Sequence, residues 1–170
     1  SDPVALERAL RIYNGRPLIN SVNGGAESMA AVFPLAKKYG AAVVALTLDE
    51  GGIPSTAAGR IAIAEKILAT AKTYGLSEQD LIVDALAMTV STGPDNAAVA
   101  LETLDYVRHR LGMQTVLGVS NISFGLPCRG YLNTTFLTMA MSAGLDLAIM
   151  NPNTPEMMAA VRAYRVLTCQ

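Results

Sequence analysis

The sequence has no apolar run long enough to cross a membrane, which takes roughly 18–20 residues. The longest run, at 41–48, has only the length of a β-strand. Yet hydrophobic residues make up 51% of the chain, charged residues 16%, and mean hydropathy is +0.34. Short apolar runs in so apolar a sequence are typical of parallel strands covered by helices. We therefore expect no membrane partner and strands that are buried on both faces.

Several other features are scarce. Net charge is −1 and the basic residues are scattered, so the basic stripe of a nucleic-acid binder is missing. No signal-peptide pattern is present. Cys128 and Cys169 show no C-x-x-C spacing, and with His109 as the single histidine they do not predict a zinc or other metal site. We expect two free thiols in a reducing cytoplasm, with His109 exposed or structural.

Helices and strands alternate strictly along the chain. A first helix is expected to start at Asp2–Pro3, and strands are expected at 17–21, 42–48, 81–86, 115–119 and 145–150. The helices that follow are expected at 26–39, 56–74, 96–111, 132–143 and 156–167, several of them ended by glycine. Strands recur about every 32 residues, close to the ~31 residues per unit of a (β/α)₈ barrel. An open doubly wound sheet shares this alternation, but neither a G-x-G-x-x-G fingerprint nor a P-loop is present.

Polar residues stand at the carboxyl end of all five expected strands, where α/β folds gather their chemistry. They are Asn20–Ser21, Asp49–Glu50, Asp84, the 120–123 segment and Asn151. Asp84 is the strongest signal, because a carboxylate inside a Leu-Ile-Val-x-Ala-Leu strand is costly to bury without a dedicated donor. It can cap a neighbouring backbone group, or it can accept two parallel hydrogen bonds from a planar ligand. Asp49–Glu50 is interpreted as the start of a solvated loop.

Five stretches carry a resemblance to a known family. They are Pro-Leu-Ile-Asn-Ser-Val-Asn-Gly at 17–24, the 39–50 segment, Leu-Ile-Val-Asp at 81–84, Gly-Val-Ser-Asn-Ile-Ser-Phe-Gly-Leu-Pro at 118–127, and Ala-Ile-Met-Asn-Pro at 148–152. Together they resemble the pterin-binding (methyltetrahydrofolate) domain of cobalamin-dependent methionine synthase and the related methyltetrahydrofolate:corrinoid methyltransferases. The resemblance covers essentially the whole chain, and the 118–127 stretch is its most specific part.

The resemblance implies a TIM barrel that binds 5-methyltetrahydrofolate at its mouth and transfers the methyl group to a corrinoid (cobalamin) on a partner domain or protein. Asp84 is expected to accept from the N3–H and 2-amino group of the pterin, and Asn20 to bond the other ring edge. Asn121 is expected to face the methylated N5 as the catalytic residue, accepting a hydrogen bond from its protonated form. The remaining residues implied to line the site are Gly118, Ser120, Arg129 and Asn151.

The chain departs from that family in length. The barrel has eight strands and five are expected here, so residues 1–170 are interpreted as the C-terminal part, about five β/α units, of a TIM (β/α)₈ barrel. An open five-stranded sheet leaves two unpaired edges, so we expect a homo-oligomer or pairing with the missing N-terminal segment. Two alternatives stay open: a non-catalytic barrel fragment, and a dihydropteroate synthase-like enzyme. The latter family uses a lysine where this chain has Ser120–Asn121.

Overall fold

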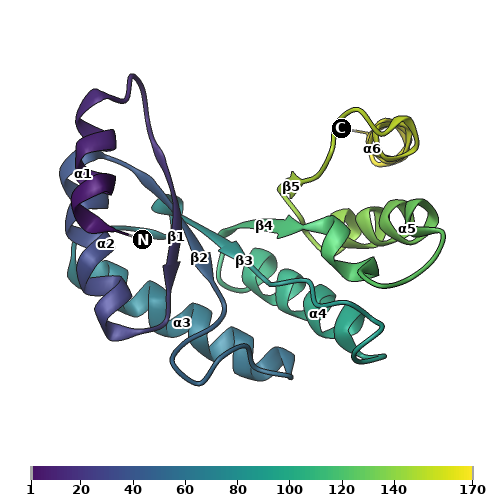
Figure 1. The fold of residues 1–170 in the computed structure, drawn as a ribbon, viewed down its shortest axis with the longest axis horizontal. Helices are drawn as coiled ribbons and strands as arrows, with labels where there is room; N and C mark the ends of the chain where they lie inside the picture. Colours follow the sequence, from purple (N-terminus) through teal and green to yellow (C-terminus); the bar gives the residue numbers. More distant parts are fainter. Residues whose placement is uncertain (1, 170) are drawn as a thin grey trace.

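The computed structural model describes residues 2–169 and consists of five parallel strands that alternate with helices (Figure 1). The strands are β1 (Leu18–Asn23), β2 (Ala42–Leu46), β3 (Leu81–Asp84), β4 (Gln114–Gly118) and β5 (Leu147–Ile149). The helices are α1 (Pro3–Ile12), α2 (Ala26–Tyr39), α3 (Ala57–Thr73), α4 (Asn96–His109), α5 (Arg129–Ser142) and α6 (Pro155–Leu167). Two 3₁₀ helices, η1 (Glu78–Asp80) and η2 (Val119–Ser123), precede β3 and follow β4. The predicted α/β class with five strands is confirmed.

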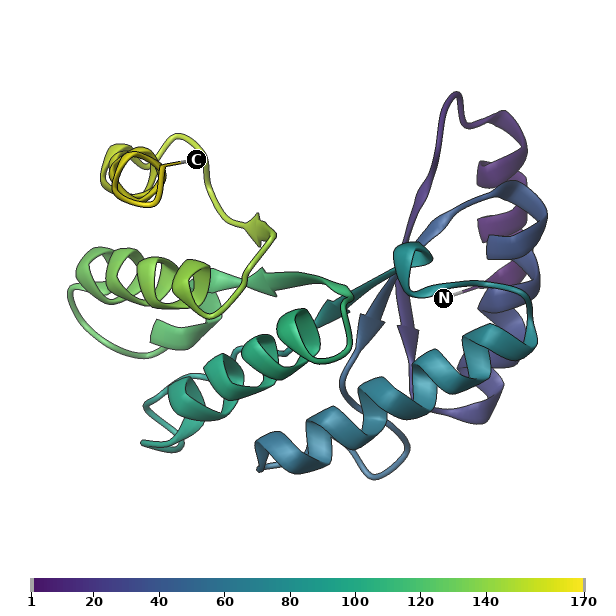
Figure 2. The same cartoon turned by 180° about the vertical axis from the view of Figure 1, so that it is seen from behind.

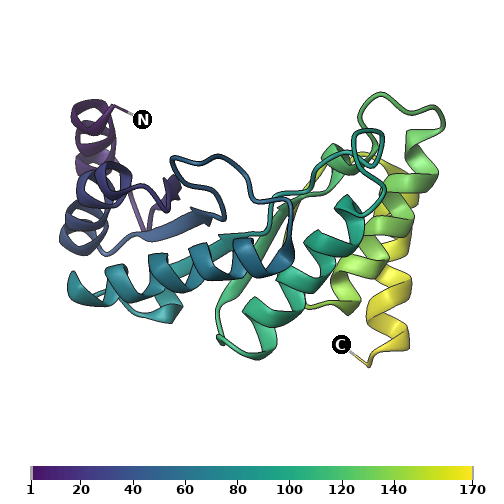
Figure 3. The ribbon, with the colours of Figure 1, turned by 90° about the horizontal axis from the view of Figure 1, so that it is seen from below.

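The strand order separates the two architectures that the sequence left open. All neighbours are parallel and the order is β1-β2-β3-β4-β5, without the reversal that defines a doubly wound sheet. Each helix from α1 to α6 contacts the next, which places them in one row (Figure 3). Helices α3 and α4 lie side by side over the middle of the sheet (Figure 2). A singly wound sheet with its helices on one face is barrel geometry.

The core is divided between the two faces of the sheet. Two large clusters lie between the strands and the helices, one around β1–β3 with α1–α3 and one around β4 with α4–α6. A third, small cluster of Val44, Ile82 and Val116 lies on the opposite face, the inner face, which none of the helices α1–α6 covers. This arrangement explains why the strands are apolar on both sides. At the sheet edges, inner-face residues are open to solvent, with Leu18 50% and Ile149 54% exposed.

Helix ends follow the predicted capping. Asp2 Oδ1 accepts from the Val4 N–H (2.9 Å) at the start of α1, and Thr56 Oγ1 accepts from the Gly59 N–H (3.2 Å) at the start of α3. Gly40 ends α2 in the left-handed conformation with φ 63°. None of the helices within residues 2–169 is both long and apolar enough to span a bilayer.

Several predicted bounds were wrong. The strand expected at 81–86 ends at Asp84, because Leu86 is left-handed (φ 59°) and leaves the sheet. The helix expected to begin at 132 begins at Arg129, after Cys128 turns the chain with φ 52°. The strand expected at 145–150 is shortened to Leu147–Ile149. Cys128 and Cys169 are exposed free thiols, as predicted.

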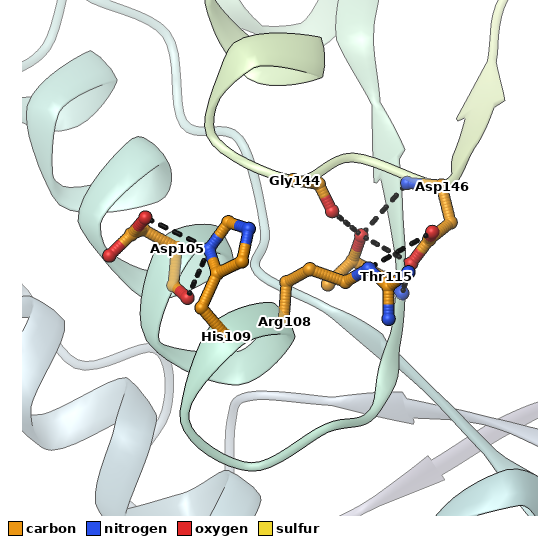
Figure 4. A network of polar contacts seen from close by, with 6 residues as sticks. All are labelled: Asp105, Arg108, His109, Thr115, Gly144 and Asp146. Carbon is orange, nitrogen blue, oxygen red and sulfur yellow. Dashed lines mark hydrogen bonds and ion pairs between the residues drawn. The ribbon is translucent and has the colours of Figure 1, made fainter. Parts of the chain in front are cut away.

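A polar network joins the amino-terminal ends of β4 and β5 (Figure 4). The buried Thr115 hydroxyl donates to the Gly144 carbonyl (2.7 Å) and accepts from the Asp146 N–H (3.0 Å). The Asp146 carboxylate accepts from the Thr115 N–H (3.0 Å) and lies 3.3 Å from Arg108 Nε. His109 is exposed and bonds Asp105 within α4, which agrees with its predicted structural role. The network holds the short β5 in place.

Candidate functional site

Asp84 lies at the carboxyl end of β3 on the inner face. It is in register with Leu46 on one side and Val116 on the other, and both belong to the inner-face cluster. Its Oδ1 accepts the Leu86 N–H at 2.8 Å, so the backbone-capping role that the sequence allowed is present. Burial raises the pKa of Asp84, opposed by that hydrogen bond and by the positive charge of Arg60. A carboxylate has about four acceptor positions, so one backbone donor leaves it able to bind a donor-rich ligand.

The η2 helix carries Ser120 and Asn121 directly beyond the end of β4. Asn121 is exposed, and its Nδ2 lies where a Cβ on Gly118 would approach to 2.9 Å. A side chain at 118 would therefore displace the Asn121 amide from the position where it folds back over the glycine. This contact brings together two of the predicted site residues, Gly118 and Asn121.

Arg129 fastens η2 to the start of α5. Its Nε donates to Ser123 Oγ (2.9 Å) and its Nη2 donates to the Ser120 carbonyl (2.8 Å). The guanidinium also stacks on Phe124, with Cζ 4.6 Å from the ring centroid. Ser123 in turn donates to Asn133 Oδ1 (2.7 Å), and both residues are buried. Arg129 thus holds the turn that presents Ser120 and Asn121, and it borders a hollow of about 500 Å³ between the first turns of α5 and α6.

The loop after β3 is tied to η2. Val90 N–H donates to the Ile122 carbonyl (3.0 Å), and Thr89 Oγ1 donates to the Phe124 carbonyl (2.6 Å). Hydrogen bonds therefore connect the segment that follows Asp84 to the turn that carries Asn121. This link was not predicted, because serines and threonines in loops are too common to indicate a partner 33–35 residues away.

Asn20 is exposed on β1, two strands away from Asp84, and is in register with Val44 of the inner face. The register shifts between Asn20 and Val22, at a bulge that coincides with a cis peptide between Asn20 and Ser21. Asn23 follows the bulge and caps the next turn, its Oδ1 accepting from the Gly25 N–H at 2.9 Å. Asn20 is the third of the six residues of β1, so the expectation that it stands at the end of its strand was wrong. No contact joins it to Asp84 or Asn121 within residues 2–169, and its ligand role stays a prediction.

Asn151 lies in the loop after β5 and is exposed, with its Oδ1 accepting from the Asn153 N–H (3.0 Å). Its observed contact is thus a local turn, and its proposed ligand role stays a prediction. Glu50 is exposed as predicted for a solvated loop, but its Oε1 also accepts from the Ala26 N–H (3.1 Å). A hydrogen bond with its own backbone and, second, that bond from the start of α2 lower the pKa of Glu50. A hollow of about 550 Å³ lies between this loop and Asn23.

Arg60 is a buried polar side chain beside the candidate site that was not predicted from the sequence. It is 1% exposed and lies on the face of α3 that also buries Ile63, Ala64 and Ile67. An arginine four residues before Ala64 and seven before Ile67 is on the apolar stripe of the helix, and that spacing was the available signal. Its guanidinium donates to backbone carbonyls in the loops after β2 and β3. Within residues 2–169, no three His, Cys, Asp or Glu side chains gather in a way that could hold a metal.

The comparisons with known proteins agree with this architecture. Residues 1–151 match the family described as pterin binding enzyme. The chain is 38% identical over 164 residues to methionine synthase of Mycobacterium tuberculosis, covering 89% of this chain and 14% of that protein. It is 30% identical over 169 residues to methylcorrinoid:tetrahydrofolate methyltransferase of Eubacterium limosum, covering 98% of this chain and 62% of that protein. The chain therefore spans less than two thirds of these relatives.

Solved structures show the same fold at low identity. The dihydropteroate synthase of Clostridium difficile superposes with a TM-score of 0.76 at 17% identity, over 99% of this chain and 65% of that one. The enzyme from Vibrio fischeri gives a TM-score of 0.70 at 16% identity, over 100% of this chain and 66% of that one. These likenesses confirm the prediction of about five β/α units of a TIM-barrel fold.

Proposed function

Because the chain belongs to the pterin binding enzyme family, we propose that it binds 5-methyltetrahydrofolate at the carboxyl ends of its strands for methyl transfer between that folate and a corrinoid. Relatives named methionine synthase and methylcorrinoid:tetrahydrofolate methyltransferase support this choice. The second name is written in the opposite direction. A site that stabilises one transition state accelerates the reaction both ways, so the same residues serve either direction.

The inner-face carboxylate of Asp84 is the observation that carries the proposal. It stands on a face without helices, with one backbone donor on Oδ1 and no hydrogen-bond partner for Oδ2 within residues 2–169. A pterin offers N3–H and a 2-amino group as two parallel donors, which is the pattern that a carboxylate binds best. Asn20 on the edge strand β1 supplies an amide. That amide can bond the opposite edge of the pterin ring through either its oxygen or its nitrogen.

The proposed methyl transfer does not require a general acid or base among the side chains of the site. The electron pair that takes the methyl carbon as the C–N5 bond breaks would come from a cobalt(I) corrinoid on a partner domain or protein. The bonding pair stays on N5, so N5 must carry a proton for neutral tetrahydrofolate to leave. Asn121, exposed on η2, accepts a hydrogen bond from that N5–H and favours the protonated form. Gly118 leaves room for this amide, and Arg129 holds the carbonyl of the neighbouring Ser120.

Both edges of the sheet are open in the described residues, and we propose that they are covered in the functional protein. Leu18 of β1 and Ile149 of β5 are apolar, unpaired on one side and about half exposed. Further barrel strands, or a second copy, would pair with these edges and add a wall to the site. Sedimentation velocity tests whether a second copy covers the edges. A monomer that binds folate with high affinity would show that no second copy is needed.

Titration calorimetry with 5-methyltetrahydrofolate tests the binding proposal. We expect micromolar binding by the unmodified chain and a loss of at least about 100-fold in Asp84→Asn, since two charge-assisted hydrogen bonds are weakened at about 1.5–3 kcal/mol each. Asp95→Asn is the matched control, because Asp95 is exposed and its side chain makes no cap hydrogen bond. No binding in a well-folded sample, or equal affinity in both variants, would contradict the proposal and favour a non-catalytic barrel.

A further inference from the structure

Arg60 is an arginine buried without a carboxylate partner. Its side chain is 1% exposed, and no salt bridge to it is formed by the residues between 2 and 169. A buried guanidinium is costly unless its donors are used. Three are: Nε donates to the Pro54 carbonyl (2.9 Å), and Nη1 donates to the carbonyls of Ala85 (2.8 Å) and Leu86 (2.7 Å). Arg60 therefore holds backbone in two loops at the mouth of the sheet.

The contact with Leu86 holds an unfavourable backbone conformation. Leu86 has φ 59°, in the left-handed region that non-glycine residues rarely adopt, at a cost of about 1–3 kcal/mol. In this conformation its carbonyl faces Arg60 while its N–H faces Asp84 Oδ1 at 2.8 Å. The Ala85 carbonyl and the Leu86 N–H belong to one planar peptide group, so the bond from Arg60 to that carbonyl also sets the direction of the N–H. Arg60 thus maintains the donor that orients Asp84.

Arg60 also acts on Asp84 through its charge. Burial raises the pKa of Asp84, and the two opposing influences are the Leu86 N–H and the positive charge of Arg60. Arg60 is the charged side chain that lowers the pKa of Asp84. The residues in register with Asp84 on the neighbouring strands, Leu46 and Val116, are apolar. The guanidinium makes no ion pair with the carboxylate, so it favours the ionised form without occupying its acceptor oxygens.

We propose that Arg60 is a positioning residue for the pterin-binding carboxylate: by holding the carbonyls of Ala85 and Leu86, it fixes the turn whose N–H aims Asp84 at the ligand. The ligand side of this statement rests on the proposed folate site. The control of Asp84 by Arg60 does not, because both residues and their connecting turn are present in the free protein.

Two variants separate charge from geometry. Arg60→Met keeps much of the apolar length and removes both charge and donors, whereas Arg60→Lys keeps the charge and loses the planar fork. Leu86→Gly adopts φ 59° without strain, so the double variant Arg60→Lys/Leu86→Gly should recover the turn. Lys66→Met is the matched control, because it removes an exposed positive charge from the same helix.

The first measurement is the carboxyl ¹³C NMR titration of Asp84 in the free protein. We expect a higher Asp84 pKa in Arg60→Met than in the unmodified chain, and little change in Lys66→Met. The second is calorimetry with 5-methyltetrahydrofolate. At neutral pH we expect at least about ten-fold weaker binding in Arg60→Met and Arg60→Lys, as for loss of one net hydrogen bond to a charged group, with recovery in Arg60→Lys/Leu86→Gly.

The outcomes distinguish the two proposals. If the unmodified chain binds no folate but the Asp84 titration still moves in Arg60→Met, positioning by Arg60 is supported and the folate proposal fails. An unchanged titration and unchanged affinity in a folded Arg60→Met protein overturn the role of Arg60. Should Arg60→Met not fold, the comparison of Arg60→Lys with its Leu86→Gly double variant decides: equal affinities of these two overturn the proposal, and recovery supports it.

Discussion

Replacing Thr115 with valine should loosen the last β/α unit of the sheet. The β5 strand is three residues long and exposed, and Met157 is the buried residue of α6. The Thr115 hydroxyl joins this unit to β4 through the Gly144 carbonyl and the Asp146 N–H (Figure 4). Valine keeps the shape of threonine and removes both hydrogen bonds.

The expected cost follows from these two contacts. A buried group left without its partner costs about 1–3 kcal/mol, but Asp146 is exposed and its N–H can be rehydrated in part. We therefore expect a loss of about 2 kcal/mol, which corresponds to a factor of roughly 30 in a local opening equilibrium. Because β5 and α6 make few other buried contacts, most of the loss should appear as local opening of residues 145–167.

Hydrogen exchange measures this directly. Amides of β5 and of the β5–α6 connection should exchange roughly 30-fold faster in Thr115→Val, while those of β2 stay unchanged. The matched control is Thr103→Val, since Thr103 is as buried as Thr115 but its hydroxyl donates within α4 to the Val99 carbonyl (2.7 Å). Equal exchange of residues 145–167 in the two variants would refute the role of the Thr115 hydroxyl.

Three further predictions concern α1, η2 and the reacting nitrogen. Hydrogen bonds from Lys38, then Arg11 and Tyr39, lower the pKa of Glu7 from 4.5 to about 2. The contribution of Glu7 to the attachment of α1 should thus be complete above pH 4.5 and be lost as pH falls toward 2, while the packing of Leu6 and Leu10 stays. Glu7→Gln should flatten this acid dependence in circular dichroism titrations. Arg129→Met should weaken 5-methyltetrahydrofolate binding about ten-fold and speed amide exchange in η2, with partial recovery in Arg129→Lys. Asn121→Ala should lower kcat for methyl transfer to reduced cobalamin by at least about ten-fold with little change in KM; a change confined to KM would contradict a transition-state role.

The sequence was most informative about the strands and their carboxyl ends. Burial on both faces of a parallel sheet leaves a continuous apolar run, and a polar residue that interrupts it, such as Asp84, is visible without a structure. The class and the number of β/α units could therefore be predicted, and Asp84 does end its strand. The order of strands could not, because alternation alone fits both a barrel and a doubly wound sheet.

The parts that could not be predicted depend on contacts between distant residues. Leu86 looks like the continuation of a strand, but its left-handed turn is held by contacts with Arg60 and Asp84. The early start of α5 likewise accompanies the bonds from Arg129 back to η2. Buried Asn133 looks like an ordinary helix residue until its partner Ser123 is placed beside it. In each case a side chain satisfies backbone or polar groups whose proximity arises only in the fold.

The bulge in β1 reconciles two demands on a single strand. Ile19 and Val22 are three residues apart, and both are buried in the helix-facing cluster, which simple alternation would forbid. Ser21 is the extra residue of the bulge and has no partner in β2. The other five residues, Leu-Ile-Asn-Val-Asn, therefore alternate between the two faces as in a regular strand. The bulge therefore changes only the backbone pairing with β2, and Asn20 stays on the inner face. The strand thus places the Asn20 amide on the inner face while Ile19 and Val22 both remain buried against the helices.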